Sequence, residues 1–207
     1  MNDPTVFLID DDASVRDSLA LLLSLKGMRT QLFARAGTFL ETYQNEWRGC
    51  VLTDLRMPEM SGLDLQKALS SRNIDLPVVV LTAHGDVQTT RAAMKNGAFD
   101  FLEKPVDHDI LLDVLGNAIR EDTVRHAAQR VEDVARSRLD RLTPRERDVL
   151  DLLVQGLSQR DTAGRLGISP RTVEVYKARM MEKLQCRSVA DVVRLAITGA
   201  NPIQKAI

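Results

Sequence analysis

Aspartate, threonine and lysine side chains stand where short apolar runs of this sequence end, and together they could handle a phosphoryl group. They are Asp10, Asp11, Asp12, Asp54, Thr82 and Lys104. Clustered carboxylates repel one another unless a cation joins them, and a set of oxygen ligands favours a hard ion such as Mg²⁺. A metal ion and an ammonium would neutralise the oxygens of a phosphoryl group while a carboxylate attacks its phosphorus. The expected product is an aspartyl phosphate.

Five β-rich runs alternate with helical stretches in the first half of the chain, and this alternation places the polar residues. The predicted strands are residues 5–10, 28–33, 50–54, 78–82 and 99–102. Alternation of this kind is typical of βαβ units, so we predict a doubly wound α/β domain with a five-stranded parallel sheet. The carboxyl ends of parallel strands share one edge, where ligands bind near the topological switch point. The site should therefore lie at that edge.

Capping signals predict where the helices between these strands begin and end. A hydroxyl stands three residues before a carboxylate in three pairs, Ser14 with Asp17, Thr38 with Glu41, and Ser61 with Asp64. Gly27 and Gly97 are predicted to close the first and fourth helices, because glycine readily adopts the left-handed backbone that often ends a helix.

The set of polar residues resembles the receiver domain of bacterial response regulators, over about residues 4–120. The resemblance is carried by Asp10-Asp11, by Asp54 within Thr53-Asp54-Leu55-Arg56-Met57-Pro58, by Thr82-Ala83 and by Lys104-Pro105. It implies a flavodoxin- or CheY-like fold in which a sensor histidine kinase phosphorylates Asp54. It also implies a Mg²⁺ or Mn²⁺ ion held by the side chains of Asp11 and Asp54, by the Arg56 backbone carbonyl and, through water, by Asp10.

The same resemblance assigns roles to residues around Asp54. Thr82 is expected to follow the phosphoryl group and Lys104 to pair with it. The Lys104–Pro105 bond is expected to be cis, which only proline makes accessible at low cost. Phe101 stands at the position of the family's aromatic switch residue, where a tyrosine is often found, so its rotation would involve no phenolic hydrogen bond. Thr82, Phe101 and Pro105 are thus the expected switch residues.

Other polar residues near this set have simpler interpretations. Asp12 is expected to support the turn into the first helix rather than to bind metal, and His84 to be a solvated loop residue. Phosphatases of the haloacid dehalogenase type place a second carboxylate two residues after the nucleophilic aspartate, where this chain has Arg56. Rapid turnover of a free phosphate ester is therefore not expected. We predict no enzyme beyond self-phosphorylation and slow loss of the phosphoryl group to water.

A helical linker is predicted after the first domain. From Leu111 the sequence is helical with few breaks, and an apolar stripe recurs at helical spacing through Val124, Ala128, Val131 and Ala135. This stripe fits either a coiled-coil seam between two chains or a stiff spacer that packs on its own domain.

Four short helices are predicted in the second half. Thr143 and Glu146 form a capping box with a proline between them, and that helix continues until Gly156. Three more are predicted from Ser158 to about Gly167, from Ser169 to about Leu184, and from Ser188 to about Gly199. Two helices joined by a tight glycine-containing turn are typical of the helix-turn-helix, whose second helix enters the DNA major groove.

Charge is distributed unevenly along the chain. Residues 1–120 carry 12 basic against 17 acidic residues, and residues 121–207 carry 16 against 12. Between residues 158 and 187, three acidic residues face seven basic ones, Arg160, Arg165, Arg171, Lys177, Arg179, Lys183 and Arg187. A solvated basic face is one interpretation, but with the helix-turn-helix this cluster favours contact with DNA phosphates.

The second half resembles the LuxR-type four-helix DNA-binding domain over about residues 138–200. The matching segments are Leu142-Thr143-Pro144-Arg145-Glu146, Leu157-Ser158, Leu166-Gly167-Ile168-Ser169, Thr172-Val173-Glu174-Val175-Tyr176 and Met181-Glu182-Lys183-Leu184. Together with the receiver, the whole chain resembles response regulators of the FixJ subgroup within the NarL/LuxR class.

The expected DNA contacts lie on the recognition helix and are Arg171, Thr172, Glu174, Val175, Lys177, Ala178 and Arg179. Glu174, Val175 and Ala178 fall where relatives contact base edges, and a carboxylate could accept from cytosine N4. Several relatives carry lysine at positions 174 and 178, so their base preference does not transfer. The lysine and arginines suit phosphates, whereas Val173 and Tyr176 suit the core or the positioning of the backbone.

Length and composition are compatible with two modest domains. The chain has 207 residues, of which 44% are hydrophobic and 28% charged, as in globular rather than disordered or collagen-like proteins. Cys50 and Cys186 form no C-x-x-C pair, so neither a disulfide framework nor a zinc site is expected. The sequence lacks a signal peptide and a membrane-spanning run, which predicts a cytoplasmic bacterial protein without membrane contact.

We place a receiver at residues 1–120, a helical linker at 121–137 and the helix-turn-helix domain at 138–207.

These features predict a two-component transcription factor. The resemblance implies that phosphorylation of Asp54 favours a homodimer through the 86–102 face, which would bind two half-sites of promoter DNA and work with RNA polymerase. The unphosphorylated receiver would either cover the recognition helix or simply fail to dimerise. Two rival interpretations are a constitutive DNA-binding protein with a vestigial acidic site and a metal-dependent phosphatase.

Overall fold

The structure, a computed structural model, describes residues 3–83, 95 and 97–200. The chain divides into two compact units, Met1–Arg125 and His126–Ile207, and the division falls within the long helix α5 (His108–Leu139). His84, the fourth helix expected from the sequence and most of the expected 86–102 dimer face lie outside the described residues.

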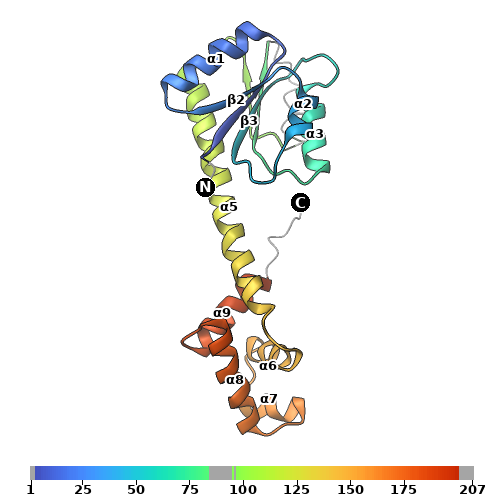
Figure 1. Ribbon diagram of the computed structural model, residues 1–207, viewed down its shortest axis with the longest axis vertical. Helices are drawn as coiled ribbons and strands as arrows, with labels where there is room; N and C mark the ends of the chain where they lie inside the picture. The colour runs from blue at the N-terminus through green and yellow to red at the C-terminus, as the bar shows by residue number, and fades with distance from the viewer. Residues whose placement is uncertain (1–2, 84–94, 96, 201–207) are drawn as a thin grey trace. The chain divides into compact units, whose positions relative to one another are not determined.

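The first unit is built on a five-stranded parallel sheet (Figure 1). Its strands are β1 (Thr5–Ile9), β2 (Arg29–Phe33), β3 (Gly49–Asp54), β4 (Val78–Thr82) and β5 (Asp100–Glu103). The predicted sheet is confirmed, and each strand begins and ends within one residue of its expected bounds. The strand order β2-β1-β3-β4-β5 reverses direction after β1, so the topological switch point lies between β1 and β3.

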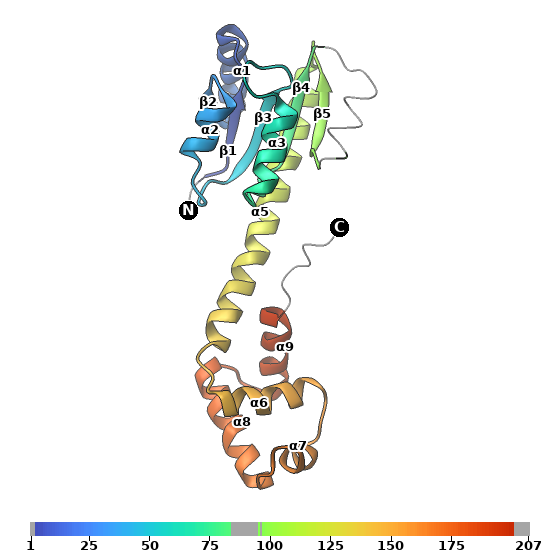
Figure 2. The ribbon, with the colours of Figure 1, turned by 90° about the vertical axis from the view of Figure 1, so that its right-hand side faces the viewer.

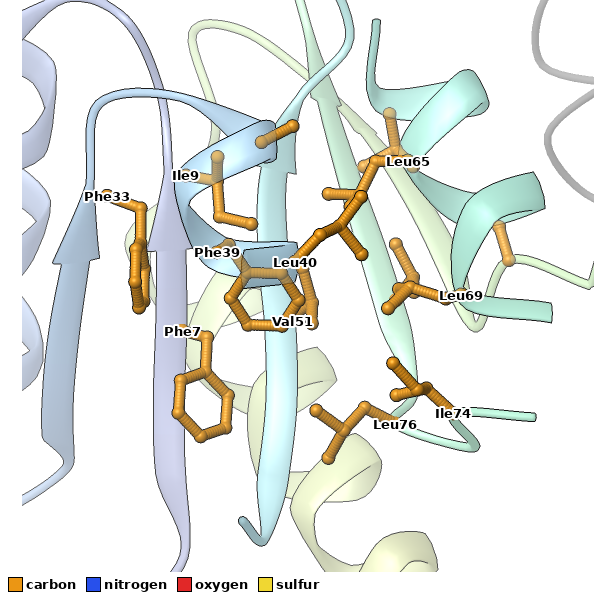
Figure 3. Packing of buried hydrophobic residues seen from close by; sticks show 14 of the residues in the cluster. Phe7, Ile9, Phe33, Phe39, Leu40, Val51, Leu65, Leu69, Ile74 and Leu76 are labelled. Carbon is orange, nitrogen blue, oxygen red and sulfur yellow. The ribbon is translucent and has the colours of Figure 1, made fainter. Parts of the chain in front are cut away.

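Helices cover both faces of the sheet, and each face buries its own apolar cluster. Helices α1 (Ala13–Leu25) and α5 lie on one face, and α2 (Ala36–Thr42) and α3 (Gly62–Ser71) on the other (Figure 2). Successive strand residues point to opposite faces. Strand β1 accordingly turns Val6 and Leu8 toward α1 and α5. Phe7 and Ile9 point toward α2 and α3 (Figure 3).

Trp47 packs against the cluster beneath α2 and α3. Its ring stacks on that of Phe7, with the ring centroids 4.6 Å apart and an interplanar angle of 10°. The rings of Phe39 and Tyr43 lie 5.9 and 5.8 Å from it. Because the sequence contains one tryptophan, Trp47 fluorescence reports on the folding of the first unit.

The helix starts expected from capping pairs are partly wrong. Ser61 caps α3 as predicted, and Gly27 after α1 has a φ of 73°. Helix α1, however, begins one residue after Asp12, whose side chain accepts the N–H groups of Ser14 and Val15, so Ser14 lies inside the first turn.

Helix α2 likewise begins earlier than its capping pair predicts. Its N-cap is Arg35, which makes no side-chain cap bond, and Thr38 lies within the helix. Ala36, Phe39 and Leu40 are buried against the sheet. The packing of this apolar face therefore sets the start of α2, overriding the local preference of Thr38 for a cap.

A buried carboxylate fixes α5 to the edge of the sheet opposite the strand carboxyl ends. Asp122, 1% exposed, accepts a hydrogen bond of 2.9 Å from the N–H of Gly49 at the start of β3. Its other oxygen lies 3.2 Å from Nη2 of Arg125, which also donates to the Asp75 carbonyl. Gly49 has a φ of 126°, and a Cβ there would overlap the backbone of Thr5. This residue must therefore remain glycine.

The second unit contains four helices after α5 in the described part of the chain. They are α6 (Pro144–Val154), α7 (Gln159–Leu166), α8 (Pro170–Leu184) and α9 (Val189–Ala200). Thr143 forms the predicted capping box with Glu146, and Ser158 and Ser169 cap α7 and α8 as expected. Gly167 in the left-handed conformation ends α7 and makes the tight turn into α8.

Glu146 joins α6 to α8 in addition to capping α6. Its carboxylate is 3% exposed, lies 2.7 Å from the Lys183 Nζ, and accepts the Thr143 N–H at 2.8 Å. Burial raises the pKa of this carboxyl, but the hydrogen bonds from Lys183 and Thr143 outweigh it and hold the pKa below its usual value. Lys183 was expected among the phosphate contacts, and this pairing instead gives it a structural role.

The apolar stripe predicted on the linker is confirmed as helical but is mostly unburied. Val124 and Val131 are 64% and 60% exposed, whereas Ala135 is buried. Near Ala135 the helix α5 closely approaches α9, where a Cβ on Gly199 would lie 3.2 Å from the Arg136 nitrogen. Within the described ranges, none of the helices combines the length and apolar character needed to span a bilayer.

Replacing Asp122 by alanine should destabilise the first unit by about 2–4 kcal/mol, because it leaves the Gly49 N–H and the Arg125 guanidinium without their buried acceptor. Asp122→Asn, which keeps one acceptor, should cost less. Urea unfolding followed by Trp47 fluorescence measures the effect, and Asp113→Ala, an exposed site on the same helix, is the control. Equal midpoints for the Asp122 and Asp113 variants would contradict this role.

Replacing Lys183 by methionine should destabilise the second unit by about 1–3 kcal/mol, because a buried carboxylate loses its cation. The far-UV circular dichroism transition in urea should shift while the Trp47 transition stays in place. A folded-state pKa below the unfolded value of about 4.3 means that the contribution of Glu146 is complete above that pH and declines as the pH falls. The cost of Lys183→Met should therefore shrink toward pH 3, and Glu146→Gln in the same chain should recover part of it at pH 7.

Candidate functional site

The strand register brings the expected phosphoryl-handling residues to one edge of the sheet. Ile9 pairs with Thr53, so Asp10 and Asp54 follow at the same level on β1 and β3, at the switch point. Thr82 pairs with Glu103, which places Lys104 one residue beyond on the adjacent strand. The carboxyl ends of four strands are thus aligned, as the sequence predicts.

The central contact of this site is an ammonium between two carboxylates. The Lys104 Nζ lies 2.5 Å from Asp54 Oδ1 and 3.0 Å from Asp10 Oδ2. Asp10 is 2% exposed and Asp54 9% exposed, and the Lys104 side chain is itself largely buried. Two carboxylates this close together repel each other, so the shared cation is what makes their burial tolerable.

Backbone groups hold the other carboxylate oxygens. The Asp12 N–H donates to Asp10 Oδ1 at 2.9 Å, and the Arg56 N–H donates to Asp54 Oδ2 at 2.7 Å. The Lys104 N–H donates to the Thr82 carbonyl at 2.6 Å, which fixes the base of the lysine against β4. Main-chain N–H groups therefore orient both carboxylates, and the backbone of Lys104 is fixed against β4.

The electrostatics keep Lys104 charged. Burial lowers the pKa of its ammonium, but the hydrogen bonds and negative charges of Asp54 and Asp10 outweigh this effect and raise the pKa above its usual value. The positive charge is consequently present throughout the neutral range, available to an incoming anion.

The loop after β3 closes tightly over the strand end. The Gly62 N–H donates to the Leu55 carbonyl at 3.0 Å, and a Cβ on Gly62 would lie 2.6 Å from the Asp54 carbonyl oxygen. Only glycine permits this approach. The result is a short loop, residues 55–61, that ends at the Ser61 cap of α3 and leaves Arg56 exposed.

The oxygen donors at this edge suit a hard divalent cation, although they do not form a closed cage. Asp11 is exposed beside Asp10, and the Arg56 carbonyl follows Asp54 by two residues. Among the described residues, no three histidine, cysteine, aspartate or glutamate side chains come together as a metal cluster. Three carboxylates here face the Lys104 ammonium and the Arg16 guanidinium, which donates to the Asp10 carbonyl at 2.6 Å. Every donor named is oxygen, which is the chemistry that Mg²⁺ prefers.

The expected switch residues lie around this site in different environments. Thr82 is 1% exposed at the end of β4, and Phe101 is half-buried against the cluster under α2 and α3. Pro105 is exposed, and the Lys104–Pro105 peptide bond is cis, as expected. Asp12 caps α1 as described above, in agreement with its expected role in the turn.

The expected DNA contacts all lie on α8, the second helix of the helix-turn-helix. Five are exposed, namely Arg171, Glu174, Val175, Ala178 and Arg179, and the remaining two, Thr172 and Lys177, are half-buried. Val173 is buried and Tyr176 packs against the core of the second unit, which confirms both as core residues.

Two contacts near the start of α8 were not evident from the sequence. The Thr172 hydroxyl lies 2.8 Å from the Ser169 hydroxyl, so it takes part in the helix cap. Gln159 on α7 donates to Glu174 Oε2 at 3.0 Å. Polar side chains fifteen residues apart on different helices carry no periodic signal, so nothing in the sequence pointed to this pair.

Comparisons with known families match the two parts of the chain to two different families. Residues 6–116 match the response regulator receiver domain, and residues 140–196 match the bacterial regulatory proteins of the luxR family. The receiver match contains the acidic edge of the sheet, and the second match contains α6 to α8 and most of α9.

Individual relatives span nearly the whole chain. The transcriptional regulatory protein FixJ of Azorhizobium caulinodans is 44% identical over 206 residues, covering 97% of this chain and 96% of the relative. FixJ of Bradyrhizobium diazoefficiens is 41% identical over 192 residues, covering 93% and 94%. The solved structure of the response regulator StyR is 41% identical, with a TM-score of 0.86 over 95% of this chain and 99% of that one.

The acidic strand-end site, the exposed recognition helix and these matches over both units lead to one conclusion. The chain belongs to the response regulators of two-component systems, with a receiver domain followed by a LuxR-type DNA-binding domain, and is homologous to FixJ.

Proposed function

We propose that Asp54 accepts a phosphoryl group from a sensor histidine kinase and that phosphorylation controls promoter binding by α8. The observation that carries this proposal is the Lys104 ammonium held between Asp54 and Asp10 at the strand ends. A cation and backbone N–H groups already surround the carboxylate that would be modified. The site is thus preorganised for additional negative charge.

In the proposed transfer, an Asp54 carboxylate oxygen attacks the phosphorus of a phosphohistidine. The phosphorus–nitrogen bond breaks, and its electron pair leaves with the imidazole. Lys104, protonated in the neutral range, neutralises the phosphoryl oxygens, and the Arg56 N–H keeps Asp54 oriented for attack. Thr82 stands at the neighbouring strand end, where its hydroxyl could bond a phosphoryl oxygen.

The proposed metal ligands are Asp11, Asp54, the Arg56 backbone carbonyl and, through water, Asp10. When bound, Mg²⁺ or Mn²⁺ would supply neutralisation of the phosphoryl oxygens. The protein's own part is to concentrate carboxylates at the switch point and to keep a lysine opposite them.

The proposed switch starts from the change of charge at Asp54. A phosphoryl group brings up to two negative charges and three strong acceptors to the position where Lys104 now bonds a carboxylate. Thr82 and Phe101 would rearrange in response, and Pro105 connects Lys104 to the start of α5. We propose that these changes favour a homodimer through the 86–102 face.

Dimerisation would present two recognition helices to two half-sites about one DNA turn apart. Arg171, Lys177 and Arg179 are proposed phosphate contacts, and Glu174, Val175 and Ala178 proposed base contacts, with Thr172 supporting them. In this proposal the protein acts in the bacterial cytoplasm with a histidine kinase, promoter DNA and RNA polymerase as partners.

The rival phosphatase interpretation lacks a general acid at the position where phosphatases of the haloacid dehalogenase type place one. The position two residues after Asp54 holds Arg56, whose side chain is exposed and whose N–H bonds Asp54. An arginine does not supply the proton that the leaving group of a phosphate ester would need. The geometry therefore favours a single stored phosphoryl group over rapid turnover.

Incubation with Mg²⁺ and acetyl phosphate should add one phosphoryl group to the chain, detected by intact mass. Asp54→Asn should abolish the adduct because it removes the nucleophile, and Asp64→Asn, an exposed aspartate on α3, should leave it unchanged. Lys104→Met should slow formation by about 100-fold, since the site loses its cation. An adduct that persists in Asp54→Asn would assign the modification to another residue.

Affinity for promoter DNA should fall steeply with salt, and Arg171→Ala and Arg179→Ala should each reduce the slope of log K against log salt by about 1. Fluorescence anisotropy with labelled duplexes measures this slope. Acetyl phosphate should tighten binding by the parent protein but not by Asp54→Asn. Equal responses in both proteins would instead support a constitutive DNA-binding protein with a vestigial receiver site.

A further inference from the structure

The Gln159 side chain joins the first turn of α7 to the first two turns of α8. Its Nε2 atom donates a hydrogen bond of 2.8 Å to the Pro170 carbonyl and one of 3.0 Å to Glu174 Oε2. A primary amide nitrogen carries two hydrogens, and each of them has one of these acceptors. Because the first bond is to the backbone of α8, the amide is fixed relative to the helix that carries Glu174.

The two acceptors lie on the same face of the recognition helix. Pro170 and Glu174 are four residues apart, which places them one turn apart on one side of an α-helix. The next turn of this side carries Ala178, another expected base contact. Gln159 therefore holds the Glu174 carboxylate along the face of α8 that would meet the bases.

An amide positions a carboxylate without neutralising it. The hydrogen bond takes one lone pair of Oε2, and a carboxylate offers about four acceptor sites. The remaining sites keep their negative charge for a donor on DNA. The buried Glu146 differs from Glu174, because the Lys183 ammonium pairs with its carboxylate and neutralises its charge.

A fixed, charged acceptor discriminates between bases in the major groove. Cytosine N4 and adenine N6 present amino donors there, whereas guanine O6 and N7 and thymine O4 present acceptors that a carboxylate repels. A glutamate that rotates freely would meet several base edges, and holding it in one orientation restricts it to one base pair.

We propose that Gln159 is a positioning residue for base recognition, which orients Glu174 so that the regulator prefers an amino-bearing base, cytosine or adenine, at one position of each half-site. This inference rests on the proposed function of α8 as the DNA-reading helix. It adds a residue outside α8 to the determinants of sequence preference.

The test compares sequence preferences of full-length variants. The parent protein, treated with Mg²⁺ and acetyl phosphate, selects duplexes from a randomised pool, which are then sequenced. The base pair contacted by Glu174 is the one at which Glu174→Ala loses preference. Gln159→Met, which keeps side-chain length without the amide donors, and the double variant Gln159→Met with Glu174→Ala are measured in the same way.

Gln159→Met should lower the preference at that base pair by about three- to tenfold, a range set by the loss of one oriented base contact. The double variant should match Glu174→Ala, because without the carboxylate there is nothing left for Gln159 to position. Arg160→Met, an exposed neighbour on α7, should weaken binding to all duplexes evenly. Circular dichroism melting checks that every variant is folded.

Three results would overturn the inference. Gln159→Met could weaken binding to all sequences equally, which would give Gln159 a purely structural role between α7 and α8. It could leave the preference intact, or Glu174→Ala could alter no base preference. A parent protein that binds DNA without any sequence preference is a different outcome, because it contradicts the proposed function itself.

Discussion

The structure depends on one electrostatic constraint, the burial of two carboxylates around one lysine. Asp10 and Asp54 come from strands on either side of the switch point, and Lys104 reaches both from the carboxyl end of the edge strand β5. Buried charges of one sign are stable only when a cation compensates them. The parallel register, the tight loop at Gly62 and the backbone bonds to both carboxylates all serve to maintain this arrangement.

Under the proposed function, the same constraint connects chemistry at Asp54 to the start of α5. Lys104 is bonded through its side chain to Asp54 and through its N–H to the Thr82 carbonyl. Four residues further along, the chain enters α5, which begins at His108 and continues into the second unit. Asp122 anchors α5 to the start of β3 inside the first unit. A change of charge at Asp54 would therefore act on a lysine that lies close in sequence to the start of this anchored helix.

The sequence was most informative where the pattern is local or periodic. Strand alternation predicted the sheet, and the capping residues Ser61, Thr143, Ser158 and Ser169 predicted helix starts. The pairs at Ser14 and Thr38 failed, because Asp12 and the buried face of α2 determine those starts instead. Contacts between distant segments, such as Asp122 with Gly49 or Gln159 with Glu174, depend on packing geometry that no local spacing encodes.

Two glutamates of the DNA-binding unit, Glu146 and Glu174, show how the environment decides the role of one type of side chain. Glu146 is buried, accepts the Thr143 N–H and pairs with Lys183, so its charge stabilises the fold. Glu174 is exposed on a helix within a basic cluster, where a carboxylate would approach the negatively charged backbone of DNA. If α8 contacts DNA as proposed, this charge lowers affinity for every sequence through repulsion. A carboxylate at this position would then be favourable only where a base donor compensates it, so its proposed contribution is discrimination between sequences rather than binding strength.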